Sequence, residues 1–178
     1  MQTTATDAGA NRPAGKGEQI IMTPERRTLI ESIRTLPDTL ESAVRGLTDR
    51  ELDTPYREGG WTLRQVVHHL ADSHLNAFVR MKLILTEDHP TLKPYDQNRW
   101  AVLPDSLRMP VGPSLALVRG LHERWCALLE SVQESEWSKT AHHPERGDVS
   151  LDGILSTYAH HGGNHVQQIL SLRRKQGW

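Results

Sequence analysis

The sequence has a single cysteine among 178 residues and no long hydrophobic run. One thiol, Cys126, cannot form an internal disulfide or a paired-cysteine zinc or redox motif, and this fits a reducing compartment. No apolar stretch approaches the roughly 18 residues of a transmembrane helix, and the N-terminus lacks the basic start and apolar stretch of a signal peptide. We therefore expect a cytoplasmic protein.

An excess of charge of either sign is also missing, because 21 Lys and Arg stand against 22 Asp and Glu for a net charge of −1. Without a long single-sign run, we expect neither nucleic acid nor a membrane surface as a partner. The length suits one domain, and a hydrophobic fraction of 37% allows a sizeable core. What stands out instead is histidine, with ten residues, several of them adjacent.

The chain divides into a tail and one predicted domain. Residues 1–17 are polar and without periodicity, so we expect a disordered N-terminal tail, which leaves 18–178 as the domain. Four segments of the domain repeat apolar residues with the helical period of about 3.6. Their expected starts follow the cap-type residues Thr23 and Thr62, lie at Ser114, and follow Ser150.

Two of these segments have distinctive ends and interruptions. In the first, Pro37 falls inside the apolar pattern and is expected to kink or interrupt the helix. In the second, Thr62 and Gln65 form a T-x-x-Q capping box. The proline-rich segment 89–113 predicts a long connection with at most short helical turns. Residues 137–149 predict an irregular stretch that could form a short extended pair. We predict an all-α four-helix bundle with a long crossover connection.

Two histidines of the last helix, His161 and His165, fall on its inward face, whereas His160 points away. A spacing of four lets both imidazoles reach one metal ion, as in H-E-x-x-H enzymes. Gly162 and Gly163 lie between them at a cost of about 1 kcal/mol each relative to alanine, so we expect a close approach to the backbone there. The alternative is a pair of hydrogen-bonded core histidines.

A third ligand should come from another helix, because two imidazoles alone do not hold a divalent ion firmly against water. On the second helix, His68 lies nearly opposite the apolar stripe and is predicted to be solvated. His74 lies within the stripe, as a core residue or a ligand. His69 lies on its border and heads a polar strip typical of a cavity wall or a solvated flank. The members of this strip are Gln65, His69, Ser73, Asn76 and Arg80. Periodicity leaves His69 and His74 both open.

The remaining histidines give weaker indications. His122 and Cys126 are spaced to bind zinc, but Cys126 is more typical of a small core residue. His142 and His143 precede a proline in the irregular stretch, where exposed histidines are common, although they could border the mouth of a site.

The stretch around the second helix start resembles a known family. Residues 59–74 read GGWTLRQVVHHLADSH and are similar to the W-T-x-x-x-x-x-x-H-L-x-x-S region of the DinB superfamily, closest to its YfiT-like branch of metal-dependent hydrolases. The similarity continues through 82–87, 93–96, 114–125 and 158–165 to Gly177 and Trp178. Some members carry extra histidines between the last pair, where this chain has Gly162, Gly163 and Asn164.

The resemblance implies a four-helix bundle in up-down-down-up order, a homodimer, and a divalent metal held by three histidines. Carried onto this sequence, the ligands are His69, His161 and His165, so the resemblance favours His69 over His74. We expect one metal ion per chain, zinc or nickel first among the metals that imidazole suits.

Three neutral imidazoles leave a divalent ion its full charge and an open position, which is typical of a catalytic site. The ion could acidify a water toward a pKa of about 7 for hydrolysis. Alternatively, a low-molecular-weight thiol could bind as thiolate and attack an electrophile, as in the bacillithiol-type S-transferases of the same superfamily. A non-catalytic metal-binding stress protein is the third hypothesis. No glutamate occupies the general-base position of H-E-x-x-H, and no substrate-binding residue is assigned.

Overall fold

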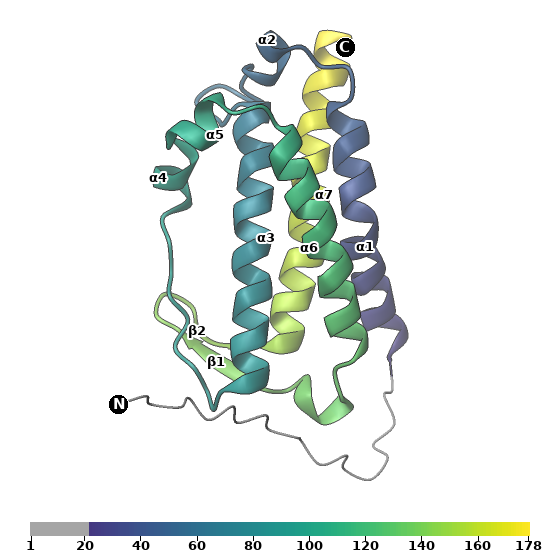
Figure 1. Cartoon of the computed structure of the whole chain (residues 1–178), viewed down its shortest axis with the longest axis vertical. Coiled ribbons are helices and arrows are strands. Elements are labelled where there is room, and N and C mark those ends of the chain that lie inside the picture. The colour runs from purple at the N-terminus through teal and green to yellow at the C-terminus, as the bar shows by residue number, and fades with distance from the viewer. Residues whose placement is uncertain (1–21) are drawn as a thin grey trace, which may run out of the picture.

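Four long helices form a bundle in this computed structural model, which describes residues 22–178 (Figure 1). They are α1 (Pro24–Val44), α3 (Leu63–Thr86), α6 (Gly112–Glu130) and α7 (Leu151–Gln176). The chain runs up α1, down α3, down α6 and up α7. The predicted all-α bundle and its up-down-down-up order are confirmed, while the predicted tail, residues 1–17, lies outside the described residues.

Helices α1 and α3 stand at opposite corners, because each packs against both α6 and α7. Two consecutive helices, α3 and α6, run in the same direction, so the connection between them returns along the bundle. This connection, which we call the crossover, spans residues 87–111 and carries only the short helices α4 (Gln97–Ala101) and α5 (Pro104–Arg108).

Each of the other two connections joins two helices at the same end of the bundle. Helix α2 (Asp49–Leu52) lies between α1 and α3 at the upper end, and the 3-10 helix η1 (Glu134–Glu136) follows α6 at the lower end. The strands β1 (Thr140–His143) and β2 (Gly147–Ser150) then pair antiparallel, with Ala141 opposite Val149. The predicted extended pair is thus present. No helix among residues 22–178 is long and apolar enough to cross a bilayer.

Capping residues begin the helices where the sequence predicts. Thr62 Oγ1 accepts from Gln65 N at 3.2 Å, and Gln65 Oε1 accepts from Thr62 N at 2.9 Å, which completes the capping box of α3. Ser150 Oγ accepts from Gly153 N at 3.1 Å to begin α7. Helix α6 begins at Gly112, two residues before the predicted start.

Pro37 does not interrupt α1, which runs unbroken through the proline, so that part of the prediction was wrong. Proline has no N–H, and the carbonyl four residues earlier, at Ile33, therefore lacks its helical donor. That carbonyl instead accepts a hydrogen bond from His122 Nδ1 on α6 at 2.6 Å. The bond across the helix interface provides Ile33 with the partner that the helix itself cannot supply.

The core consists of two hydrophobic clusters, one below the other. The lower cluster takes Ile30 and Ile33 from α1 and surrounds Trp125, whereas the upper cluster surrounds Leu40 and Leu70. On α3 the border between them falls between residues 70 and 77, and on α7 between residues 159 and 166. These intervals contain His74, His161 and His165, and His69 lies directly before the first of them, so a layer of imidazoles separates the two halves of the core.

Candidate metal centre

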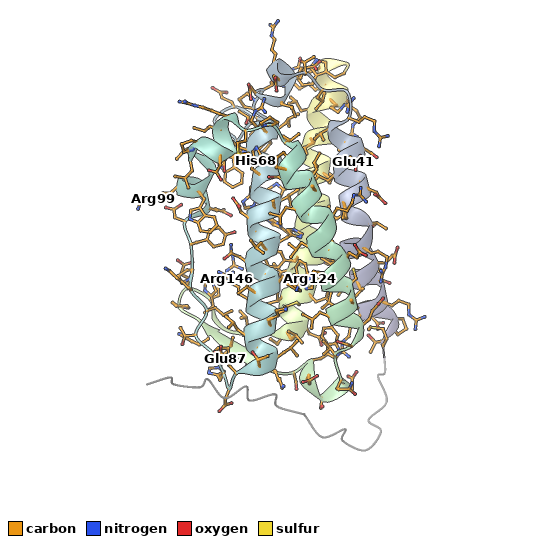
Figure 2. The ribbon with its side chains drawn as sticks, in the orientation of Figure 1. Glu41, His68, Glu87, Arg99, Arg124 and Arg146 are labelled. Carbon is orange, nitrogen blue, oxygen red and sulfur yellow. The ribbon has the colours of Figure 1, made fainter. Side chains whose placement is uncertain are left out.

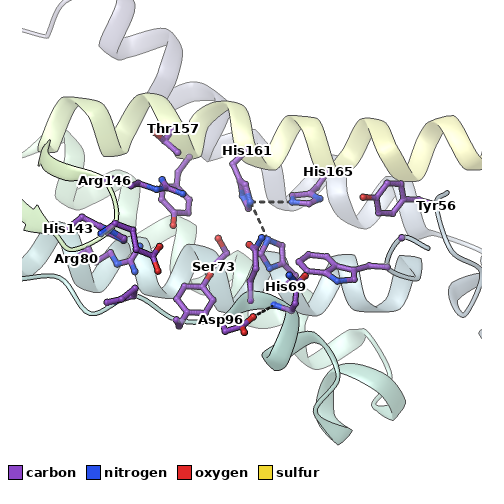
Figure 3. Close-up of a pocket in the computed structure, with 18 of the residues that line it drawn as sticks. Tyr56, His69, Ser73, Arg80, Asp96, His143, Arg146, Thr157, His161 and His165 are labelled. Atoms are coloured by element: carbon purple, nitrogen blue, oxygen red, sulfur yellow. Dashed lines mark hydrogen bonds between the residues drawn. The ribbon is translucent and has the colours of Figure 1, made fainter. Parts of the chain in front are cut away.

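Three histidine side chains from two neighbouring antiparallel helices converge on one point (Figure 3). His161 Nε2 lies 3.2 Å from His69 Nε2 and 3.2 Å from His165 Nε2, and one ring nitrogen from each residue lies within 4.8 Å of the others. The sequence-predicted trio is therefore brought together, His69 by α3 and the other two by successive turns of α7.

The donor set fits a divalent ion. With Zn–N bonds near 2.05 Å, tetrahedral ligands place neighbouring nitrogens about 3.3 Å apart, close to the separations found here. His165 Nδ1 donates to Gln168 Oε1 at 2.8 Å, which leaves the lone pair of its neutral ring on Nε2, the atom that faces the other two rings.

Burial keeps these rings neutral. It lowers the pKa of His69 to about 3, with a further contribution from the charges that His165 and His161 would carry. Burial and the neighbouring His165 lower the pKa of His161 to about 4, and burial also lowers the pKa of His165. Metal ligation requires the deprotonated imidazole, so near neutral pH all three rings are in the state that binds an ion.

Trp61 packs beside two of the three rings. Its ring lies 4.6 Å from that of His69 and stacks on that of His165 at 6.5 Å with an interplanar angle of 13°. Because Trp61 immediately precedes the N-cap of α3, the capping box that begins the helix also holds the indole close to the imidazoles. The tryptophan thus fixes one part of the surroundings of His69 and His165.

The three rings open into a pocket of about 890 Å³, and Trp61 forms part of its lining. Its walls come from three connections: residues 56–61 before α3, residues 94–98 of the crossover, and residues 143–146 of the hairpin. Arg80, His143 and Arg146 gather at one end and Tyr56 lies at the other (Figure 3). The predicted cavity wall on α3 is present in part, since His69, Ser73 and Arg80 line the pocket and Gln65 and Asn76 do not.

His143 departs from its prediction as an ordinary exposed loop residue. Its side chain is buried and lines the pocket, while His142, the neighbour on the strand, is exposed. Alternation along β1 explains the difference, because successive side chains point to opposite faces. The suggestion that this pair borders the mouth of a site therefore applies to one member.

His68 was predicted to be solvated, and this was wrong, because it is only 6% exposed (Figure 2). Its Nδ1 lies 2.7 Å from Ser114 Oγ and its Nε2 lies 3.2 Å from the Met109 carbonyl. The helices α4 and α5 of the crossover pack on α3 and cover this polar face. Arg64, one turn earlier, is buried in the same way and pairs with Asp49 and Asp53.

Two further histidines, His74 and His122, are buried behind the metal centre. His74, left open between core and ligand, is fully buried, and its Nε2 lies 3.3 Å from His161 Nδ1 on the side away from the other Nε2 atoms. His122 contacts His74 rather than sharing a site with Cys126, whose thiol faces the Ile30 carbonyl. In the sequence, only the spacing of His122 to Cys126 drew attention to this residue, and nothing there indicates a contact with His74.

The two glycines between the α7 histidines differ in their surroundings. A Cβ on Gly162 would collide with Leu36 Cδ2, so glycine allows α1 to approach α7 at this point. A Cβ on Gly163 would meet nothing within 4 Å. The expected close approach to the backbone is present at Gly162 and absent at Gly163.

The fold and the histidine cluster together define a class: four-helix bundles of up-down-down-up order with a possible three-histidine metal site. The model of the DinB superfamily matches residues 32–169, and the chain belongs to this superfamily. A Bacillus cereus protein named "Putative metal-dependent hydrolase" is 48% identical over 151 residues, which are 85% of this chain and 87% of that protein. A Bacillus thuringiensis protein with a similar name matches to the same extent.

Solved structures agree with this assignment. YfiT from Bacillus subtilis, described as "a probable metal-dependent hydrolase with an unusual four-helix bundle topology", is 41% identical with a TM-score of 0.86. The match covers 92% of this chain and 94% of that one. TT2238, a four-helix bundle protein, has a TM-score of 0.56 at 18% identity over 82% of this chain and 98% of that one, and this likeness concerns the fold alone.

Proposed function

We propose that the protein is a divalent-metal-dependent hydrolase whose ion is bound by the Nε2 atoms of His69, His161 and His165. The observation that carries the proposal is the convergence of three neutral imidazole nitrogens at the floor of a large pocket. The names of the relatives from Bacillus species support the same activity. Zinc and nickel are the metals we propose first, because both accept all-imidazole ligand sets.

An ion held by three neutral ligands keeps its full positive charge and an open coordination position, and so supplies Lewis-acid assistance to hydrolysis. The chain's own residues would prepare the site for this. Gln168 orients His165 through its Nδ1–H, and Trp61, part of the pocket lining, packs against the rings of His69 and His165. These contacts hold the ligand rings before an ion arrives, which lowers the cost of ordering them.

The charges of the pocket favour an anionic substrate. Arg57, Arg80 and Arg146 line it, and within residues 22–178 none of the three forms an ion pair with a carboxylate. Two carboxylates, Asp96 and Glu145, are also present, but Asp96 Oδ1 is occupied in capping α4. Unpaired guanidinium groups attract and orient carboxylate or phosphate groups of a substrate.

The metal content of purified protein tests the proposal. Wild type is expected to carry about one ion per chain and the double variant His161→Ala, His165→Ala almost none, because the remaining imidazole cannot hold the ion against water. The matched control is His160→Ala, since His160 lies on the same helix but is exposed and points away. Equal metal content in wild type and the double variant would exclude the site.

The second candidate is a thiol S-transferase, which the open pocket and its arginines also suit, because a small anionic thiol could enter and bind as thiolate. Consumption of an electrophile, measured with and without low-molecular-weight thiols, separates the two activities. Turnover that does not depend on thiol excludes the transferase. A metal-loaded protein that turns over neither class of substrate would instead fit the metal-binding stress protein.

The proposal includes a homodimer. Five large apolar side chains of the crossover are exposed and form the surface that would support self-association. They are Trp100, Val102, Leu103, Leu107 and Met109. Light scattering on the purified protein is expected to give twice the chain mass, and the mass of a single chain would exclude the dimer.

A further inference from the structure

A chain of hydrogen bonds leads from a backbone carbonyl in α1 to one of the three converging imidazoles. The Ile33 carbonyl oxygen lies 2.6 Å from His122 Nδ1, His122 Nε2 lies 2.9 Å from His74 Nδ1, and His74 Nε2 lies 3.3 Å from His161 Nδ1. Both ring nitrogens of His74 and of His122 are thus engaged. The chain crosses the bundle from α1 through α6 and α3 to α7.

The two middle rings are enclosed. His74 is 0% exposed and His122 is 1% exposed. The edge of Trp125 contacts both rings, and Tyr158 packs perpendicular to His74. The planes of the two imidazoles differ by only 17°, which is compatible with a hydrogen bond lying in both ring planes. This packing leaves the rings little freedom to turn.

The direction of the chain follows from its first member. A carbonyl oxygen only accepts, so His122 Nδ1 carries a hydrogen. Both rings are buried, and their hydrogen-bond partners are a carbonyl and other imidazoles rather than carboxylates, so both rings are neutral and each has one N–H. His122 Nε2 therefore accepts from His74 Nδ1, and His74 Nε2 in turn accepts from His161 Nδ1.

We propose that His74 and His122 are positioning residues that fix the tautomer of His161, with the hydrogen on Nδ1 and the lone pair on Nε2. Pro37 makes this arrangement possible, because it has no N–H that could bond the Ile33 carbonyl within α1. The carbonyl therefore accepts from His122 Nδ1, and this first bond decides the direction of the others. The effect on metal binding rests on the function proposed above. Partners of this kind contribute roughly 10- to 100-fold to metal affinity in other proteins.

The tautomers can be measured directly on the full chain. Two-bond ¹H–¹⁵N correlation spectra of ¹⁵N-histidine-labelled protein, recorded before and after zinc is added, distinguish a protonated from an unprotonated ring nitrogen. We expect the hydrogen on Nδ1 of both His74 and His122 in both samples. A hydrogen on Nε2 of either ring overturns the proposal, and because the metal-free spectrum does not involve zinc, this outcome is separate from failure of the metal site itself.

Zinc affinity, measured by competition with a chromophoric chelator, provides the second test. His74→Phe keeps a ring of similar breadth but offers no acceptor to His161, and we expect affinity to fall by about 10- to 100-fold. His74→Gln retains an amide oxygen that can accept the same hydrogen bond, so it should recover much of the loss. Unchanged affinity in His74→Phe overturns the proposal.

His68→Phe is the matched control for packing. His68 is also a buried histidine on α3 with both ring nitrogens engaged, but its partners, Ser114 and Met109, lie outside the chain of hydrogen bonds. We expect zinc affinity within about twofold of wild type. An equal loss in His68→Phe and His74→Phe would assign the effect to general destabilisation and reject the positioning role. If His74→Phe does not fold, His122→Gln, which cannot bridge Ile33 and His74 as imidazole does, replaces it with the same expected outcome.

Discussion

The imidazole layer has a pocket end and a core end, built from the same residue type in the same region of the bundle. At the pocket end, the Nε2 atoms of His69 and His165 each lie 3.2 Å from Nε2 of His161, beside a cavity of about 890 Å³. At the core end, His74 and His122 use both ring nitrogens in hydrogen bonds and do not line that cavity. Burial alone therefore does not distinguish a candidate ligand from a positioning residue. The distinction lies in where each nitrogen is directed.

His161 belongs to both ends, so replacing it has the largest expected effect. His161→Ala removes the imidazole whose Nε2 is close to both other candidate ligands and whose Nδ1 ends the hydrogen-bond chain. We expect bound zinc to fall to about one-tenth of wild type or less, because two imidazoles hold a divalent ion weakly. Elemental analysis after gel filtration measures it. Retention of a full equivalent of metal would mean that the pocket end does not function as proposed.

The core end predicts a pH dependence of folding stability that does not need a metal. His122 has a pKa of about 4 in the folded chain and near 6.5 when unfolded, so below pH 6.5 the unfolded state binds more protons. The free energy of unfolding is expected to fall by about 3 kcal/mol between pH 6.5 and pH 4 from this residue, and to change little above pH 7.

Urea titrations of metal-free wild type and His122→Phe across this range test the prediction. The variant lacks the titrating group and should show a shallower decline, while His160→Ala, which changes an exposed histidine, should follow wild type. Parallel curves for wild type and His122→Phe would show that burial of this ring is not what couples stability to pH.

The two glycines between the α7 histidines allow a comparison within one helical turn, because Gly162 packs against α1 and Gly163 faces open space. Gly162→Ala forces a Cβ into Leu36 and is expected to lower the free energy of unfolding by about 1–3 kcal/mol. Gly163→Ala meets no atom within 4 Å and should raise it by up to about 1 kcal/mol through helix propensity. Thermal melts of both variants give the sign. The same sign for both would mean that contact with α1 does not decide the outcome.

The smallest effect is expected at Pro37, far from the pocket. Pro37→Ala restores an N–H that competes with His122 for the Ile33 carbonyl, so the anchor of the hydrogen-bond chain weakens without being removed. We expect zinc affinity to fall about threefold, which corresponds to less than about 1 kcal/mol of binding free energy. This is the size expected when one hydrogen bond is weakened. The same chelator competition measures it. A loss as large as that of His74→Phe would mean that the proline acts through helix geometry rather than through the carbonyl.

Local patterns were enough to predict much of the fold and part of the site. The caps at Thr62 and Ser150 and the apolar period predict where the helices lie. The helical period also places His161 and His165 on the inward face of α7, because the apolar residues of the same helix define its core face. These features depend on residues a few positions apart, which is the range over which a sequence pattern carries information.

The remaining features depend on which segments cover which faces. His68 is buried by the crossover, and His122 gains its role from a proline on a different helix, so neither outcome is encoded in its own helix. The choice of His69 over His74 came from the family resemblance, because both rings lie inward on α3. The two differ only in which nitrogen of His161 on α7 they contact, which is Nε2 for His69 and Nδ1 for His74. Predicting such contacts needs the packing of helices that are distant in sequence.

The pocket is divided between rigid and replaceable parts. The converging imidazoles project from the long helices α3 and α7, whereas much of the remaining wall comes from segments 56–61, 94–98 and 143–146, which connect helices. Connections tolerate insertion and substitution far better than packed helices do. A protein engineer could therefore exchange these three segments for those of other superfamily members, and change which molecules enter, while leaving the histidine centre and its hydrogen-bond chain intact.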